Sequence, residues 1–153
     1  MRRADTASRI IAAPAHAIYQ ALVDGEALVT WLPPDTMTGE LLEFEPRPGG
    51  PFRMVLRYAE GGHGKTTDDT DMMNAEFAEL VPDQRVVWLV TFKSDDLAFA
   101  GTMRMVWDLE PAAEGTRVII LAEDVPEGIN KEDHDAGLRS SLANLARFVG
   151  DRS

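Results

Sequence analysis

Cysteine is absent from this chain of 153 residues, and no stretch approaches the run of about 18 apolar residues that a membrane-spanning helix needs. The lack of cysteine excludes disulfides, thiolate metal ligands and a cysteine nucleophile, and it fits a reducing compartment. The amino-terminal segment MRRADTASRI has no apolar run behind its two arginines, so it does not fit a signal peptide. These absences predict a soluble, cytoplasmic protein.

Basic residues and histidines are also scarce. Lysine and arginine number 15 against 26 acidic residues, which gives a net charge of −11. A field of this sign repels phosphate backbones and anionic lipids, so we predict no nucleic-acid and no membrane partner. His16, His63 and His134 lie far apart and none has a second histidine at helical spacing, which argues against a zinc site. The acidic residues form short runs and no tail, so we attribute the charge to solubility.

The clearest pattern that is present lies in residues 130–150. Its apolar residues recur at helical spacing, namely Leu138, Leu142, Leu145 and Val149. Asn130 can cap the amino end and Gly150 can end the helix. A helix of about 20 residues is roughly 30 Å long, which is close to the width of a seven-stranded sheet. The sequence therefore predicts one long helix that spans a sheet.

The rest of the chain has mostly the two-residue period of strands. We expect strands at 3–11, 39–45, 52–58, 71–80, 85–93, 101–109 and 116–123, and helices at 14–24 and 26–32. The last strand is apolar on both faces, so its inward face is not evident. Short hairpins after the two helices imply antiparallel pairing. This order predicts an α+β fold, one domain over residues 1–153, with about seven strands curved around the terminal helix.

Large apolar side chains fall on one face of the expected strands. They are Met54, Tyr58, Met73, Phe77, Trp88, Phe92, Met103, Met105 and Trp107. Methionine and aromatic side chains can line an adaptable cavity. They can equally fill a solid core, and the sequence alone does not separate a hollow interior from a filled one.

Patterns that would indicate catalysis or a cofactor are weak. Residues 59–66, AEGGHGKT, match a loose phosphate-loop pattern, but an acidic segment and a strand follow where that mechanism needs a helix. Asp68, Asp69 and Asp71 do not complete a calcium-binding loop. His134 is expected to be a surface residue. We predict no catalytic residue, metal site or cofactor, and Tyr58 is the one side chain that we single out for chemistry if there is any.

A series of short motifs resembles those of a known family. They are Ile11-Ala12-Ala13-Pro14 before Ile18-Tyr19-Gln20-Ala21-Leu22, then Trp31-Leu32-Pro33-Pro34, Pro48-Gly49-Gly50-Pro51-Phe52, Glu79-Leu80-Val81-Pro82 and His134-Asp135-Ala136-Gly137-Leu138. In order and spacing they resemble the START-like, helix-grip (SRPBCC) superfamily. The branch that they resemble most is related to the carboxyl-terminal domain of the Hsp90 ATPase activator (AHSA1-like). The resemblance extends from about Ser8 to Val149.

The resemblance implies an apolar pocket between the sheet and the terminal helix. In such relatives the pocket admits lipids, polyketides or other hydrophobic small molecules. We therefore predict that the nine inward side chains named above, together with Leu138 and Leu142, contact a ligand. Relatives of this branch usually have tryptophan at the position of Leu138, so a ligand preference does not carry over.

Three functions follow in order of preference. The first is a carrier or sensor that binds a hydrophobic small molecule, and the second is an enzyme of the polyketide cyclase or aromatase type. The third is a co-chaperone of Hsp90, which ranks last because relatives with that activity have an additional amino-terminal domain. Overall we expect a binding protein and not an enzyme. An open sheet edge or apolar patch would also permit a homodimer, which the sequence does not decide.

Overall fold

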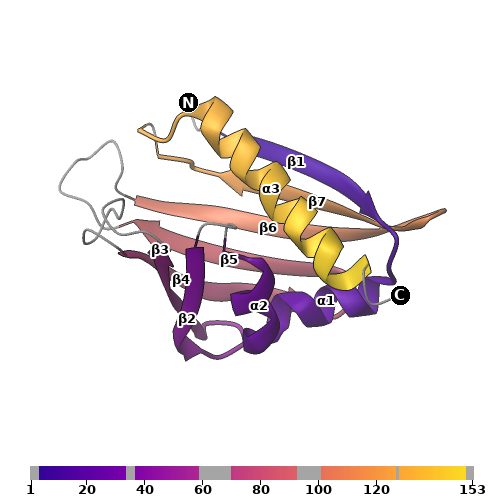
Figure 1. Cartoon of the computed structure of the whole chain (residues 1–153), viewed down its shortest axis with the longest axis horizontal. Coiled ribbons are helices and arrows are strands. Elements are labelled where there is room, and N and C mark those ends of the chain that lie inside the picture. The colour runs from indigo at the N-terminus through magenta and orange to yellow at the C-terminus, as the bar shows by residue number, and fades with distance from the viewer. Residues whose placement is uncertain (1–3, 34–36, 59–69, 93–100, 127, 151–153) are drawn as a thin grey trace.

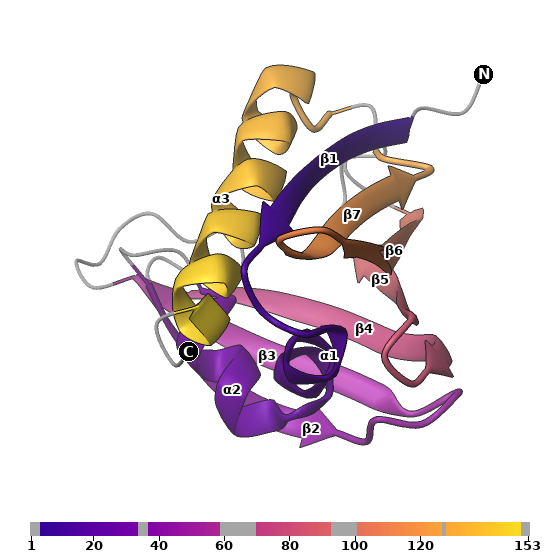
Figure 2. The same cartoon turned by 90° about the vertical axis from the view of Figure 1, so that its right-hand side faces the viewer.

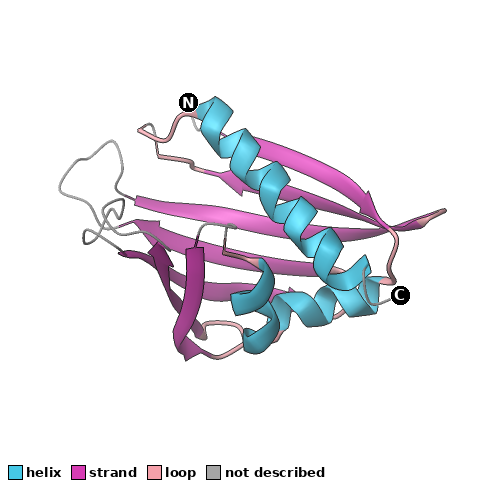
Figure 3. Cartoon of the chain, viewed as in Figure 1, coloured by secondary structure: helices cyan, strands magenta, loops and turns pink. Residues whose placement is uncertain are grey.

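The computed structural model describes residues 4–33, 37–58, 70–92, 101–126 and 128–150, with three helices and seven strands among them (Figures 1 and 3). In chain order they are β1 (Ala4–Ile11), α1 (Ala15–Val23), α2 (Gly25–Trp31), β2 (Met37–Phe44), β3 (Pro51–Tyr58), β4 (Thr70–Val81), β5 (Arg85–Phe92), β6 (Gly101–Ala112), β7 (Gly115–Glu123) and α3 (Lys131–Gly150). The expected order of elements is confirmed, and their ends differ from the expected ones by at most three residues.

The seven strands form one antiparallel sheet in the order β1-β7-β6-β5-β4-β3-β2. Consecutive strands from β2 to β7 pair as hairpins, and β1 joins the far edge by pairing with β7. The sheet curves around α3, which crosses its concave face (Figure 2). The α+β helix-grip fold expected from the sequence is thereby confirmed.

Strand β6 illustrates how alternation fixes the two faces of the sheet. Met103, Met105 and Trp107 are at most 9% exposed on the concave face. On the convex face Arg104 pairs with Glu123 at 2.7 Å, an ion pair between neighbouring strands. Since successive residues of a strand point to opposite faces, one sequence supplies both an apolar interior and a charged exterior.

Two irregularities interrupt the ladders at one side of the sheet. The register shifts between Leu41 and Glu43 of β2, and between Phe77 and Glu79 of β4. An extra residue in one strand bends it and increases its twist. The bulge in β4 is held by the turn before β3, where Gly49 donates a backbone hydrogen bond to Phe77 and Phe77 donates one to Gly50. These bulges contribute to the concave shape of the sheet.

Helix α3 has the capping and the apolar stripe that its sequence predicts. The side chain of Asn130 accepts a hydrogen bond from the backbone N–H of Asp133 at 3.1 Å. This bond satisfies one of the free donors at the amino end of the helix. The buried residues of the helix are Leu138, Leu142, Leu145 and Val149. The stripe therefore faces the sheet and the polar side faces solvent.

Helices α1 and α2 cover the part of the concave face beside the carboxyl end of α3 (Figure 2). Asp24 separates them, and its side chain accepts a hydrogen bond from the N–H of Glu26 at 3.0 Å. Trp31, at the end of α2, donates its indole hydrogen to the carbonyl of Ala21 at 2.9 Å. This bond ties the two helices to each other from inside the core.

Candidate functional site

The concave face carries a continuous surface of apolar side chains. Strand pairing places Phe77, Trp88, Met105 and Ala122 in one row across β4, β5, β6 and β7. A parallel row contains Phe52, Ala75, Val90 and Met103. Residues that face one another across neighbouring strands lie about 5 Å apart, so their side chains touch. The face is thus one connected apolar surface.

Aromatic rings form a chain of contacts over this surface. The ring centroids lie 5.5 Å apart for Phe44 and Phe52, 5.8 Å for Phe52 and Phe77, 5.2 Å for Phe52 and Trp88, 5.2 Å for Trp88 and Trp107, and 5.7 Å for Trp107 and Trp31. Most of these pairs meet edge to face, an arrangement that aromatic rings favour. The chain runs from the edge strand β2 to helix α2 and fixes the middle of the interior.

The side chains that we predicted to contact a ligand are nearly all in this interior. Among those that the structure describes, Met54, Phe77, Trp88, Met103, Met105, Trp107, Leu138 and Leu142 are buried, and Met73 is half-buried. The side chains of Tyr58 and Phe92 lie outside the described part. The structure therefore brings the described members together, and their contact with a ligand remains a prediction.

Helix α3 approaches the sheet unevenly. Its backbone comes closest to β1, α1 and α2. On the central strands, the described side chains of the concave face are almost completely buried. Among the largest of the fully buried ones are Trp88, Trp107, Phe52, Phe77 and Met54. In this conformation the centre of the interior is packed.

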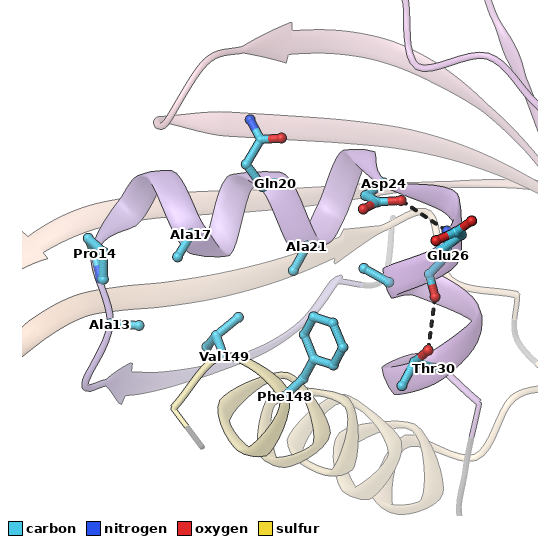
Figure 4. Close-up of a pocket in the computed structure, with 11 residues that line it drawn as sticks. Ala13, Pro14, Ala17, Gln20, Ala21, Asp24, Glu26, Thr30, Phe148 and Val149 are labelled. Carbon is cyan, nitrogen blue, oxygen red and sulfur yellow. Dashed lines mark hydrogen bonds between the residues drawn. The ribbon is translucent and has the colours of Figure 1, made fainter. Parts of the chain in front are cut away.

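The described residues form an open cleft where α1 and α2 meet the carboxyl end of α3 (Figure 4). Its volume is about 500 Å³, within the range of small-molecule sites. It is lined by Ala13, Pro14, Ala17, Gln20, Ala21, Asp24, Glu26, Ala27, Thr30, Phe148 and Val149. Ala17 and Ala21 point from α1 toward Phe148 and Val149 of α3, whereas Gln20 points away. A smaller hollow of about 280 Å³ adjoins it and shares Thr30 and Phe148.

The floor of this cleft is part of the hydrophobic core. Ala13, Ala21, Ala27 and Val149 line the cleft and are each less than 9% exposed within the core. None of the nine described side chains among those predicted to contact a ligand lines it. Sequence reasoning missed this cleft because the alanines of its lining leave a hollow between helices without any distinctive sequence pattern.

A polar cluster joins β1 to the first turn of α3. Asp5 has a fully buried side chain on the concave face, in the same row as Ala122 and Met105. Nδ1 of His134 lies 2.7 Å from one carboxylate oxygen, and Lys131 donates to the other at 3.0 Å. The hydrogen bond to Asp5 raises the pKa of Lys131, and burial opposes this shift.

The expectation that His134 is a surface residue is wrong, since its side chain is only 14% exposed. Its partner Asp5 is 129 residues away in the chain. This separation in sequence explains the error, because no local pattern around His134 indicates that β1 lies beside the amino end of α3.

The predictions about metal ions, the phosphate-loop-like segment and membrane spans are compared with the structure next. Those residues contain no group of three or more potential metal ligands. The phosphate-loop-like segment at 59–66 and the side chains of Asp68, Asp69 and Asp71 lie outside the described part. Within the described ranges, no helix is long and apolar enough to cross a membrane.

The two tryptophans at the centre of the sheet have unpaired indole N–H groups. Nε1 of Trp88 and Nε1 of Trp107 are buried and have no hydrogen-bond partner among the described residues. Trp31 differs, because its indole is bonded to Ala21. An indole N–H inside a protein usually has an acceptor. The two free donors are the least satisfied polar groups of the central interior.

Comparison with known proteins places this architecture in a family. Residues 12–150 match the family model described as Activator of Hsp90 ATPase homolog 1-like protein. A search of curated proteins found no match. A crystal structure of a protein from Chromobacterium violaceum is 28% identical, with a TM-score of 0.82 over 95% of this chain and 96% of that one.

More distant structures share the fold. An AHSA1-like protein from Aeromonas hydrophila is 14% identical, with a TM-score of 0.76 over 98% of this chain and 94% of the other. A protein from the dynemicin biosynthetic locus is 19% identical, with a TM-score of 0.69 over 96% of this chain and 47% of its own length. At these identities the likeness concerns the fold alone. Taken with the family match over nearly its whole length, the curved sheet around α3 makes this chain a member of the Activator of Hsp90 ATPase homolog 1-like family, within the helix-grip superfamily.

Proposed function

We propose that this protein binds a hydrophobic small molecule, lipid-like or polyketide-like, between the concave face of the sheet and α3, as a cytoplasmic carrier or sensor. The observation that carries the proposal is the composition of this interior. Its described central side chains are aromatic, aliphatic or thioether groups, and the buried polar residues, Asp5 and Thr116, lie on the edge strand β1 and its neighbour β7. Such a lining favours an apolar molecule.

The methionine side chains of this interior can change conformation to accommodate a ligand. Met54, Met73, Met103 and Met105 lie on the concave face. An unbranched thioether side chain adopts many shapes at small cost, so it can move aside where a branched side chain would clash. A ligand would replace contacts among these side chains with contacts to itself, and the packed conformation would be the unliganded one.

The cleft beside α3 is our proposed entrance. Its floor, formed by Ala21, Ala27 and Val149, is also the wall of the core. An outward movement of the last turn of α3 would therefore connect the cleft with the interior. Phe148, half-buried at the mouth, would give an entering apolar molecule its first contact.

The experiment is a thermal-shift screen against fatty acids, flavonoids and polyketides, followed by titration with tryptophan fluorescence. The neighbour from the dynemicin biosynthetic locus is a further reason to include natural products. A ligand at about 100 times its Kd stabilises the folded state by about 2.7 kcal/mol. For a protein of this size we expect Tm to rise by roughly 5–10 °C. If no compound raises Tm by more than about 1 °C at such an excess, the proposal is wrong.

A matched pair of variants tests the entrance. Ala17→Phe places a ring in the cleft, whereas His16→Phe places the same ring on the exposed side of the same helix, at a position that does not line the cleft. We expect Ala17→Phe to slow association in stopped-flow measurements and His16→Phe to leave it unchanged. Equal association rates in the two variants would show that ligands enter elsewhere.

An enzyme of the cyclase or aromatase type is the alternative. Asp5 and His134 are the observation that favours it, because they form a close acid–base pair at one end of the concave face. Acid–base catalysis needs such a pair within reach of the substrate. Product formation from a bound polyketide that disappears in His134→Gln, with binding retained, would establish the enzyme over the carrier.

A further inference from the structure

Two neighbouring donors in the interior point to the chemistry of the ligand. The side chains of Trp88 and Trp107 are 1% and 0% exposed, and neither indole N–H has an acceptor among the described residues. The rings lie on adjacent strands with their centroids 5.2 Å apart. A buried donor that lost its water without gaining an acceptor is unfavourable, so few such groups persist in folded proteins.

Trp31 provides an internal comparison. It is 2% exposed and also contacts Trp107, yet its indole donates to the carbonyl of Ala21 at 2.9 Å. The carbonyl of Ala21, in α1, is therefore available as an acceptor for the indole of Trp31 in α2. The fold thus satisfies the tryptophan that joins α1 to α2 and leaves the two on the sheet unpaired.

The surroundings explain why the protein supplies no acceptor there. Strands β5 and β6 each pair on both edges, so their backbone carbonyls are used within the sheet. The described side chains around them are apolar: Phe52 lies against Trp88, and Phe77 and Met105 are opposite it across the strands. Val86 and Ile120 are opposite Trp107. Ring faces and sulfur accept hydrogen bonds only weakly. An oxygen atom from outside the chain is the acceptor that these donors lack.

We infer that the molecule bound in this interior is a hydrophobic carbonyl compound, whose neutral C=O oxygen accepts a hydrogen bond from the indole of Trp88 or Trp107. The inference rests on the proposed function and narrows it to a chemical class. A ketone, aldehyde, ester or amide has the required oxygen within an apolar skeleton.

Two other oxygen groups fit less well. A carboxylate would need a buried cation, and the charged side chain that lies buried on the concave face is itself an acid, Asp5. A hydroxyl could accept from an indole, but it would also need an acceptor for its own hydrogen, which the rings and thioethers do not provide. A carbonyl satisfies the tryptophans and leaves no donor unsatisfied.

The test uses pairs of probes that differ only by C=O in place of CH₂: fluorenone and fluorene, benzophenone and diphenylmethane, and 2-decanone and decane. We expect at least one ketone to bind roughly threefold to tenfold more tightly than its hydrocarbon, as one added neutral hydrogen bond predicts. In ¹H–¹⁵N spectra the indole signal of Trp88 or Trp107 should shift downfield with the ketone and not with the hydrocarbon. The indole of Trp31, already bonded, is the internal control.

Trp88→Phe and Trp107→Phe keep a ring and remove the donor. We expect one of them, or the double variant, to bind ketone and hydrocarbon with equal affinity, whatever the change in affinity that both probes share. Equal binding of ketone and hydrocarbon to the unmodified protein would overturn the inference and leave the proposed function standing. A preference that survives in the double variant would overturn the assignment to these tryptophans. If no member of any pair binds, the proposed function fails and the inference fails with it.

Discussion

Shortening Leu142 tests the contact on which the fold depends. The side chain is 1% exposed, and Leu138 and Leu145 flank it on the same stripe of α3. Leu142→Ala removes three carbon groups worth about 0.8 kcal/mol each on transfer from water, or about 2.4 kcal/mol. The flanking leucines hold the helix in place and limit collapse, so a cavity cost adds to this and the expected loss is about 3–4 kcal/mol. That is a large part of the stability of a typical domain.

Urea unfolding followed by tryptophan fluorescence measures this loss, because Trp31, Trp88 and Trp107 are all at most 2% exposed. The control is Arg139→Ala on the exposed side of the same helix, which should change the free energy of unfolding by less than about 0.5 kcal/mol. Leu142→Asp would bury an unpaired charge and should abolish cooperative unfolding. A cost of about 1 kcal/mol or less for Leu142→Ala would refute the packing of α3 on the sheet.

Three further predictions concern polar contacts and the backbone. His134→Ala should lower the free energy of unfolding by about 1.5–3 kcal/mol in urea titrations, since it removes a hydrogen bond to buried Asp5; unchanged stability would contradict that bond. Gly115→Ala should cost roughly 1–3 kcal/mol, because Gly115 has a φ of 147° and a Cβ there would overlap the carbonyl oxygen of Ile11; a neutral effect would show that the hairpin relaxes. The pKa of Lys131 is raised above its ordinary 10.5 by Asp5, so its contribution is complete below that value and is lost as pH rises through the raised pKa. Tm should therefore fall above about pH 10, and less steeply in Lys131→Met; equal slopes would argue against the contribution of this contact.

The elements and their faces could be predicted because their signals are local. The stripe of α3 and the alternation of Met103, Met105 and Trp107 in β6 depend on residues a few positions apart, and burial follows them. The inward face of β7 was not evident, since its outer face carries Ile119 and Leu121. The structure explains this: β7 lies inside the sheet between β1 and β6, and both residues are half-buried there.

The residues that line the candidate site could be predicted from the sequence, but whether its interior is filled or hollow could not. Alternation places Met54 and Trp88 on the concave face. Whether side chains or a ligand occupy the interior between the sheet and α3 depends on how the helix packs over the sheet. The unpaired indoles depend on acceptors that only tertiary structure brings near. The cluster of Asp5 and His134 joins residues 129 positions apart, and no periodicity reports such a contact.

The bulge in the edge strand β2 also affects how readily another strand could pair with this edge of the sheet. A neighbouring sheet extends most readily along a flat, regular and uncharged strand. The ladder of β2 is broken beside Leu42, and Glu40 and Glu43 on either side form ion pairs with Arg57 and Arg53. An incoming strand would have to match a bent template and approach these charged pairs. We therefore expect the bulge that helps to curve the sheet around α3 to disfavour the addition of a further strand along β2 as well.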